Sequence, residues 1–405
     1  MRADFLRGIR FTDLTWAGAG PFGTKVFADF GAEVLKVESM ARPDAVRVTH
    51  PFRDGIPGTN RSGYFASRNT GKKSVSINMK TAEGRSLVLR LIQVSDVVSN
   101  NFGPGAMERL GLGYDIVKSH KPDIIYLSMP MYGDSGPYNR FLGVGKTIAA
   151  VTGLLHNTAY ADGDAVGPGT HYPDHAANPY HAAFAVVSAL RYRRKTGRGM
   201  NIELAQIEST SNFVGSGLLE AAITQRDPPQ TGNRSRTDAP HGIFRCAGPD
   251  SWCAIAVDSD AQWSALASAM GRADLACSPE LGDAEGRLGH TQMLETAVSE
   301  WTSVRLAKSV VSELRAAGVP AAVVASSQYL IEEDEQLMSR EYFQSVGHPE
   351  MGPSLFPSPP YRMDGERVEL NRAPLFGEHT HEVMSNILGL SGTEIADLEQ
   401  RGILT

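Results

Sequence analysis

The sequence predicts an α/β protein of two domains: a large domain built on a Rossmann-like parallel sheet, and a smaller α+β domain. In the first half of the chain, short β-branched runs alternate with helical stretches, as in parallel sheets with crossover helices. The 405 residues exceed the roughly 250–300 that one core usually holds. A polar, turn-rich stretch at residues 225–242 (QRDPPQTGNRSRTDAPHG) marks a domain boundary.

Residues 1–224 are expected to form the first part of the large domain. Strands are predicted at residues 9–14, 33–37, 73–78, 94–99, 124–129 and 200–204. Helices are predicted at residues 20–30, 82–92 and 176–195. The third helix ends in Lys195-Thr196-Gly197-Arg198-Gly199, where basic residues followed by glycine are typical of a helix end.

Residues 225–330 are expected to form the small domain. It would hold a hairpin (242–245 with 253–257), helices at 261–270, 288–301 and 306–317, and a strand at 321–324. Residues 331–405 are expected to be a linker and a return to the large domain, with a final helix at 378–388.

Composition and charge exclude several classes of protein. The formal net charge of -6 argues against a nucleic-acid partner, because such domains are usually basic. No apolar run approaches the ~20 residues that cross a bilayer, and no secretory signal opens the chain. Three cysteines are too few for a disulfide framework, and the eleven histidines show no metal-site spacing. The expectation is a cytoplasmic protein without a membrane partner or a metal.

A negatively charged ligand would therefore need a local basic pocket. Basic clusters occur at Arg68, Lys72 and Lys73 and again at residues 191–195. For the second cluster, a solvated helix end is the simpler interpretation.

Asp174 is the main candidate for chemistry, because it comes just before the helix predicted at 176–195. A carboxylate can attack a thioester carbonyl and form a mixed anhydride, which divides one difficult step into easier ones. Taken alone, an N-cap role is the commoner explanation for such an aspartate. Asp162 and Asp164 lie in a glycine-rich turn, where a solvated carboxylate is expected.

Ordered sequence blocks across nearly the whole chain resemble class III CoA-transferases of the CaiB/BaiF type, which include formyl-CoA, carnitine and benzylsuccinate CoA-transferases. The blocks are Asp13-Leu14-Thr15-Trp16-Ala17-Gly18-Ala19-Gly20-Pro21, residues 27–38 (FADFGAEVLKVE), Asn101-Phe102-Gly103-Pro104-Gly105 with Arg109-Leu110-Gly111, Lys195-Thr196-Gly197-Arg198-Gly199, Ala239-Pro240-His241-Gly242, and Ala373-Pro374 with Gly377-Glu378-His379-Thr380. Each block alone is weak, whereas the ordered set is specific.

The resemblance implies a large domain built from both chain ends and two subunits interlocked like chain links. It places the catalytic aspartate on Asp174 and implies a CoA thioester as substrate, with no permanently bound cofactor. The positions that match CoA-binding places in relatives are Trp16, Ala17, Gly18, Ala19, Lys72, Lys73, Asn101, Phe102 and Arg109. For Phe102 and Arg109, core packing and a helix-end ion pair are the alternatives.

Two departures from formyl-CoA transferases bear on the substrate. Gly18 stands where those enzymes carry a glutamine, and a polar loop at 232–238 replaces their glycine run. Arg234 and Arg236 in this loop could pair with the second carboxylate of a dicarboxylic acid, the alternative being a solvated loop. Tyr172 and His175 flank Asp174 and could shape the acyl pocket, the alternative being ordinary packing.

The same fold also serves acyl-CoA racemases, which need a base on each side of the α-carbon. Val144 stands where those relatives carry a histidine, which disfavours racemisation. An intramolecular CoA transfer remains an alternative, as does a role as one subunit of a hetero-oligomeric CoA-transferase. The main prediction is CoA transfer from an acyl-CoA donor such as succinyl-CoA to a free carboxylic acid, in particular an aryl-substituted or other dicarboxylic acid, by a homodimer or a heterodimer with a related subunit.

Overall fold

The computed structural model describes residues 4–160 and 163–405. The chain divides into two compact units. The larger comprises Met1–Leu155, Gly167–Ile223 and Ser339–Thr405, so both ends of the chain contribute to it. The smaller comprises His156–Val166 and Thr224–Met338.

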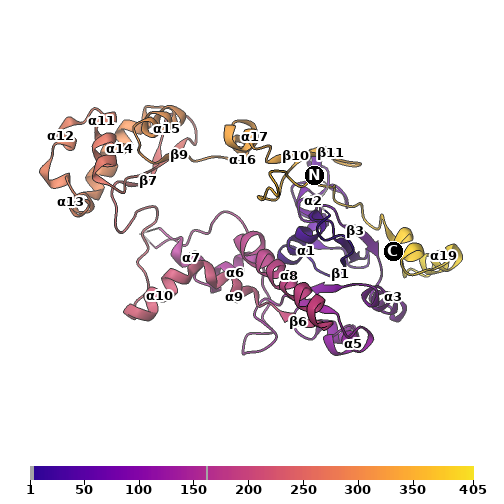
Figure 1. Cartoon of the computed structure of the whole chain (residues 1–405). Coiled ribbons are helices and arrows are strands. Elements are labelled where there is room, and N and C mark those ends of the chain that lie inside the picture. Colours follow the sequence, from indigo (N-terminus) through magenta and orange to yellow (C-terminus); the bar gives the residue numbers. More distant parts are fainter. Residues whose placement is uncertain (1–3, 161–162) are drawn as a thin grey trace. The chain divides into compact units, whose positions relative to one another are not determined.

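A six-stranded, wholly parallel sheet forms the centre of the larger unit (Figure 1). Its strands are β1 (Arg10–Asp13), β2 (Glu33–Glu38), β3 (Lys73–Ser76), β4 (Val97–Asn100), β5 (Ile125–Ser128) and β6 (Met200–Glu203). Their order is β3-β2-β1-β4-β5-β6. This arrangement confirms the predicted α/β class, and each strand lies within two or three residues of its predicted bounds.

Helices cover both faces of this sheet, as parallel sheets require. On one face lie α1 (Ala19–Asp29) and α8 (Asn178–Thr196), which pack together over Val34, Val97 and Ile125 (Figure 1). On the other face lie α3 (Ala82–Gln93), α5 (Tyr114–His120), α18 (Thr380–Asn386) and α19 (Gly392–Gln400). Neighbouring residues such as Val97 and Val98 thus point into different cores, which explains why the strands are apolar throughout.

Further short elements complete the larger unit and its connections. They are α2 (Gly63–Arg68), α4 (Ala106–Arg109), α6 (Gly145–Val151), α7 (Leu154–Asn157), α9 (Gln206–Ser211), α10 (Gly215–Thr224), and the antiparallel hairpin of β10 (Phe343–His348) and β11 (Gly352–Pro357). The sequence did not predict this hairpin, because its second strand contains Pro353 and ends at Pro357, and proline is confined to edge strands and strand ends.

The smaller unit has an antiparallel sheet in the order β7-β8-β9. Its elements are β7 (His241–Arg245), β8 (Trp252–Ala256), β9 (Ala321–Val323), α11 (Asp260–Ala269), α12 (Ala273–Ala276), α13 (Ala284–Gly289), α14 (Thr291–Ser303), α15 (Ala307–Ala316), α16 (Ser327–Glu332) and α17 (Glu335–Ser339). Trp263, Leu266 and Leu314 belong to its own apolar core.

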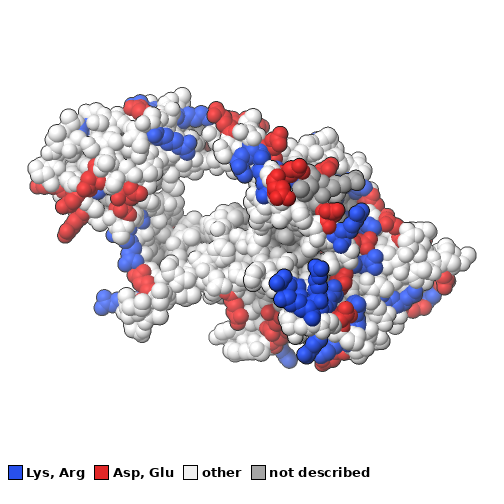
Figure 2. Space-filling view, viewed as in Figure 1, with Lys and Arg blue, Asp and Glu red and all other residues white. Residues whose placement is uncertain are grey.

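Two surface properties concern possible partners. Within the described ranges, no helix combines the length and apolar character needed to span a membrane. Figure 2 shows Lys and Arg side chains gathered over the carboxyl-terminal part of α8, whose last turn holds Arg193, Arg194 and Lys195. This second basic cluster is therefore a helix end, as expected.

Candidate functional site

The loops that follow β1 and β4 are joined where the strand order reverses. This is the place where open parallel sheets usually bind ligands. Asn101 accepts a hydrogen bond from the Trp16 backbone N–H at 2.8 Å and donates one to the Trp16 carbonyl at 2.7 Å. These two hydrogen bonds join the two loops into one continuous surface, called the wall below.

A buried charge network supports the loop after β1. Asp13 pairs with Lys72 at 3.0 Å and also accepts hydrogen bonds from the hydroxyls of Thr15, Thr24 and Ser99. Burial alone would raise the pKa of Asp13, but Lys72 and Lys36 outweigh it and lower that pKa, so Asp13 is ionised.

The next residues of the loop are held in the same way. Lys36 pairs with Asp44 at 3.0 Å, and Asp44 accepts the backbone N–H of Ala17 at 3.0 Å. Ala17 has a φ of 60°, which is uncommon for a residue other than glycine. The network thus fixes a strained loop that ends at Gly18, the residue before α1.

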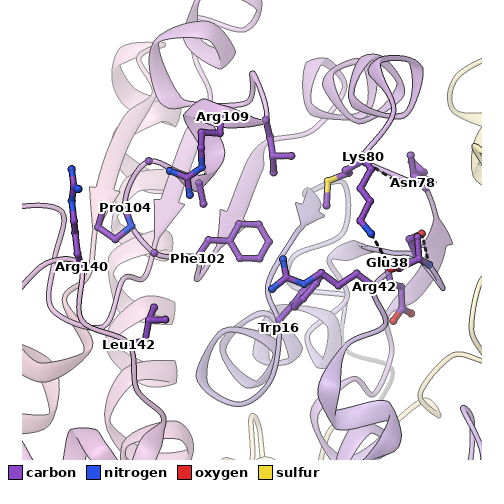
Figure 3. Close-up of a pocket in the computed structure, with 18 of the residues that line it drawn as sticks. Trp16, Glu38, Arg42, Asn78, Lys80, Phe102, Pro104, Arg109, Arg140 and Leu142 are labelled. Carbon is purple, nitrogen blue, oxygen red and sulfur yellow. Dashed lines mark hydrogen bonds between the residues drawn. The ribbon is translucent and has the colours of Figure 1, made fainter.

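A groove of about 810 Å³ opens beside this wall (Figure 3). Trp16 and Phe102 meet edge to face with ring centroids 5.7 Å apart, and the Arg42 guanidinium lies 4.7 Å from the centroid of Trp16. Side chains at the groove also include Asn78, Lys80, Arg109, Arg140 and Leu142. These residues follow strands β1 to β5, with Arg109 at the end of the short helix α4 after β4, so the groove runs along the carboxyl edge of the sheet.

Positive charge dominates this groove. Arg42, Lys80, Arg109 and Arg140 are exposed cations that line it. Glu38 is its one lining carboxylate among the described residues, and it is already bound to Arg47 and Ser74. Cations and an aromatic shelf suit a ligand that has both phosphates and a flat ring.

Asp174 lies in a single π-helical turn, η3 (Pro173–Ala177), immediately before α8. Its carboxylate fills the space left by two glycines. A Cβ atom on Gly18 would be 2.6 Å from Oδ2 of Asp174, and one on Gly145 would be 2.8 Å from the same oxygen. Gly18 precedes α1 and Gly145 begins α6, so two separate segments confine the carboxylate at the amino end of α1, whose first N–H groups lack helical partners.

Burial raises the pKa of Asp174, and the nearby His171 and Arg68 offset part of this effect. Burial also lowers the pKa of His175 to about 4, with help from Arg68 and His171. A perturbed carboxyl group in a confined site is a candidate for chemistry.

The sequence profile described as CoA-transferase family III matches residues 6–380. This chain belongs to that family. Formyl-CoA:oxalate CoA-transferase of Streptomyces coelicolor is 30% identical over 100% of both chains. The beta subunit of succinyl-CoA--L-malate CoA-transferase from Chloroflexus aurantiacus is 32% identical over 98% of both. The crystal structure of a CAIB/BAIF family protein from Brucella suis matches with a TM-score of 0.85 at 27% identity, covering 94% of this chain and 99% of that one.

Membership of CoA-transferase family III confirms the predicted resemblance and the transferase class. Enzymes of this family act on CoA thioesters and carboxylic acids.

The structure brings part of the predicted CoA-binding set to the groove of this family III enzyme. Trp16, Phe102 and Arg109 line it, and Asn101 holds Trp16 in place. Ala17, Gly18 and Ala19 continue from Trp16 to the carboxylate of Asp174 and the start of α1.

Lys72 and Lys73 are placed elsewhere. The Lys72 side chain is fully buried against Asp13. Lys73 pairs with Glu33 and with Glu382. Neither lysine lines the groove.

The weaker substrate candidates are divided between the two units. His175 lies beside Asp174, and Tyr172 packs edge to face against Phe213. Arg234 belongs to the smaller unit, where it pairs with Glu295 at 2.6 Å and binds Gln292. Arg236 follows it in the same loop. Asp162 lies outside the described residues.

Sequence reasoning missed Arg42, Lys80 and Arg140 as groove residues. The positions of two of them in the sequence could have indicated this role. Arg42 comes four residues after the end of the parallel strand β2, and Lys80 comes four residues after the end of β3. Carboxyl ends of parallel strands share one edge of a sheet.

Proposed function

We propose that this CoA-transferase moves CoA from an acyl-CoA donor to a free carboxylic acid through covalent intermediates on Asp174. The observation that carries the proposal is the fit of the Asp174 carboxylate between Gly18 and Gly145, next to the basic aromatic groove. Gly18 is two residues from Trp16, which lines that groove. A thioester at the end of a CoA bound there would meet the carboxylate.

The steps balance without any other reactant. A carboxylate oxygen of Asp174 attacks the thioester carbonyl, the C–S bond breaks, and the CoA thiolate leaves an acyl-aspartyl anhydride. The thiolate attacks the aspartyl carbonyl, releasing the donor acid and forming an aspartyl thioester. The acceptor carboxylate then attacks that thioester to give a second anhydride. Attack of the thiolate on its acceptor carbonyl yields the new acyl-CoA and frees Asp174.

Different residues of the groove would bind different parts of CoA. Arg42, Lys80, Arg109 and Arg140 would neutralise the phosphates, and Trp16 with Phe102 would offer a face to the adenine or pantetheine. At the start of α1, free backbone N–H groups would stabilise the oxyanion that develops in each attack.

For the substrates, we favour succinyl-CoA as donor and a dicarboxylic acid, aryl-substituted or otherwise large, as acceptor. A relative is named for succinyl-CoA and L-malate, which supports a dicarboxylic acceptor. Another relative is named for formyl-CoA and oxalate. Gly18 argues against those small substrates, because a glutamine side chain at this position would have to displace Asp174 as it lies here.

Racemisation and intramolecular CoA transfer are the alternative reactions. Gly145 touches Asp174, so the stretch where racemases would carry a histidine does lie at the site, and Val144 occupies it. Valine cannot act as the second base. Because Asp174 is present, we propose that this chain is a catalytic subunit, in a homodimer or paired with a related chain in the cytoplasm.

The test is mass spectrometry after incubation with succinyl-CoA and a panel of free acids. New CoA thioesters should form, and an adduct should map to the peptide containing Asp174. Both should vanish in Asp174→Ala and persist in Asp164→Ala, which removes an exposed aspartate ten residues earlier. Transfer that persists in Asp174→Ala would overturn the proposal.

A further inference from the structure

A second cavity, of about 480 Å³, lies beside η3 and does not include Gly18 or Gly145 in its lining. Six aromatic rings line it, and they come from α1 and the residue after it, from α2, from α8, from the residue before β10 and from the segment after β11. Its aromatic residues are Phe22, Phe30, Tyr64, Tyr180, Tyr342 and Tyr361. His175, which follows Asp174 directly, also lines it.

Arg68 supplies a positive charge that acts electrostatically on the nearby Asp174 but forms no ion pair in this cavity. The residue is 3% exposed and lines the cavity, and its guanidinium stacks 3.4 Å from the ring centroid of Tyr64. Its nitrogens donate to the Tyr64 carbonyl, to Ser67 and to His175, whereas its buried Nε has no hydrogen-bond partner. Throughout residues 4–160 and 163–405, no carboxylate forms an ion pair with it.

The other charges at the cavity are already satisfied. Lys25 pairs with Asp29, and Asp29 also accepts a hydrogen bond from Thr70. Arg68 is thus the cavity's one cation without a carboxylate among the described residues. Burying an unpaired charge is costly, so a guanidinium kept in this state indicates an anionic ligand.

His175 does not compete for that anion. A guanidinium only donates, so Nε2 of His175 accepts from Arg68 and the ring proton sits on Nδ1, 3.2 Å from the Thr170 hydroxyl. The imidazole is therefore neutral. It orients Arg68 and leaves that side chain as the anion-binding group.

We propose that Arg68 binds the second carboxylate of a dicarboxylic substrate whose apolar body occupies this aromatic cavity, while the first carboxyl group exchanges CoA at Asp174. This inference rests on the proposed function and names the side chain that selects the acid. It replaces Arg234 in that role, because the Arg234 guanidinium is already engaged by Glu295. Aromatic walls match an aryl substituent by edge and face contacts.

The experiment compares two acceptors of nearly equal size: phenylsuccinate, and 3-phenylbutanoate, in which a methyl group replaces one carboxylate. The kcat/KM for CoA transfer from succinyl-CoA to each acid is measured for the wild type, Arg68→Met and Arg53→Met. The control removes an exposed arginine that pairs only with Asp54 among its described neighbours. Calorimetry measures binding of each acid to the same proteins.

Wild type should prefer phenylsuccinate, and Arg68→Met should reduce this preference about 10- to 100-fold, the range expected for a lost charge-assisted bidentate contact. Arg53→Met should keep it. An equal fall for both acids, or equal binding of both by the wild type, would overturn the assignment of Arg68. If no acid accepts CoA while phenylsuccinate still binds the wild type more tightly than Arg68→Met, the proposed transfer fails and the carboxylate site stands.

Discussion

At the scale of single residues, the space for the Asp174 carboxylate exists because two neighbouring residues are glycines without side chains. Gly18 and Gly145 come from different segments, and a Cβ on either would lie within 2.8 Å of Asp174 Oδ2. A carboxylate held in one position is useful for nucleophilic attack, because small displacements cost large factors in rate. In the proposed mechanism, the two glycines would therefore act as positioning residues.

Substituting Gly145→Ala should reduce kcat at least tenfold while the affinity for CoA stays near the wild-type value. The added methyl group must displace the carboxylate or His171, whose Cβ would be 3.2 Å away. Steady-state kinetics and CoA titration measure the two quantities. Gly215→Ala is the matched control, because a Cβ there meets nothing within 4 Å. Unchanged kcat in Gly145→Ala would contradict this role.

The raised pKa of Asp174 predicts the acidic side of the pH–rate profile. Attack needs the ionised carboxylate, so activity should be lost as pH falls through a pKa above the ordinary 3.8. Arg68 is one of the charges that lower this pKa, so Arg68→Met should move the acidic limb to higher pH. The measurement is log kcat/KM against pH for both proteins with 3-phenylbutanoate. A shift to lower pH would be inconsistent with the site.

At the scale of elements, the loop between β1 and α1 depends on charges buried beneath it. Asp13, Lys72, Lys36 and Asp44 link β1, β2 and the residue before β3 to the strained backbone at Ala17. Removing one partner of a buried pair leaves an unpaired charge, which typically costs about 3–5 kcal/mol. These side chains hold the wall of the groove without lining it.

Lys72→Met and Arg42→Ala should therefore affect different properties, the first stability and the second CoA binding. Lys72→Met should lower the free energy of unfolding by about 3–5 kcal/mol, because Asp13 loses its ion-pair partner. Arg42→Ala should leave stability unchanged and weaken CoA binding by about 1–2 kcal/mol, because Arg42 is exposed over Trp16. Urea unfolding and CoA titration separate the two. Weaker CoA binding by a folded, fully stable Lys72→Met would restore the role expected from the family match.

Sequence periodicity located the six parallel strands and the helices α1, α3 and α8 because each depends mainly on local pattern. The hairpin β10–β11 and helix α19 were missed: prolines obscure the first, and the second has only a short apolar pattern. The partners of individual side chains were harder to predict from the sequence. Lys72 meets Asp13 across 59 residues and Arg234 meets Glu295 across 61, and nothing local in the sequence indicates either pair. The family resemblance indicated Asp174 as the catalytic candidate, whereas only the structure shows that Gly145 confines its carboxylate.

At the scale of the whole molecule, the end of the chain completes a core begun at its start. Ile395, Ile403 and Leu404 are buried with Val37, Val75 and Leu91. The Asn78 backbone N–H donates to the Ile403 carbonyl at 2.8 Å, next to the end of β3. In Figure 1, α19 lies on the same side of the sheet as α3.

Truncation after Leu390 should destabilise the larger unit far more than its length suggests. Each of the three buried side chains contributes about 1.5–3 kcal/mol, so their joint loss approaches the stability of a typical domain. Circular dichroism during urea unfolding measures the effect. As a control, Leu355→Ala changes an exposed leucine in β11 and should behave like the wild type. A truncated chain as stable as the full one would refute the expectation.

The same closure of the two chain ends has a consequence during translation. Domains usually fold in the order in which they leave the ribosome. Here the larger unit cannot complete its core until Leu404 has been made, whereas the smaller unit is finished at Met338. The unit that is interrupted in sequence therefore finishes folding second. The sheet face under α1 and α8 can be covered early, whereas the opposite face stays partly exposed until α18 and α19 have been made.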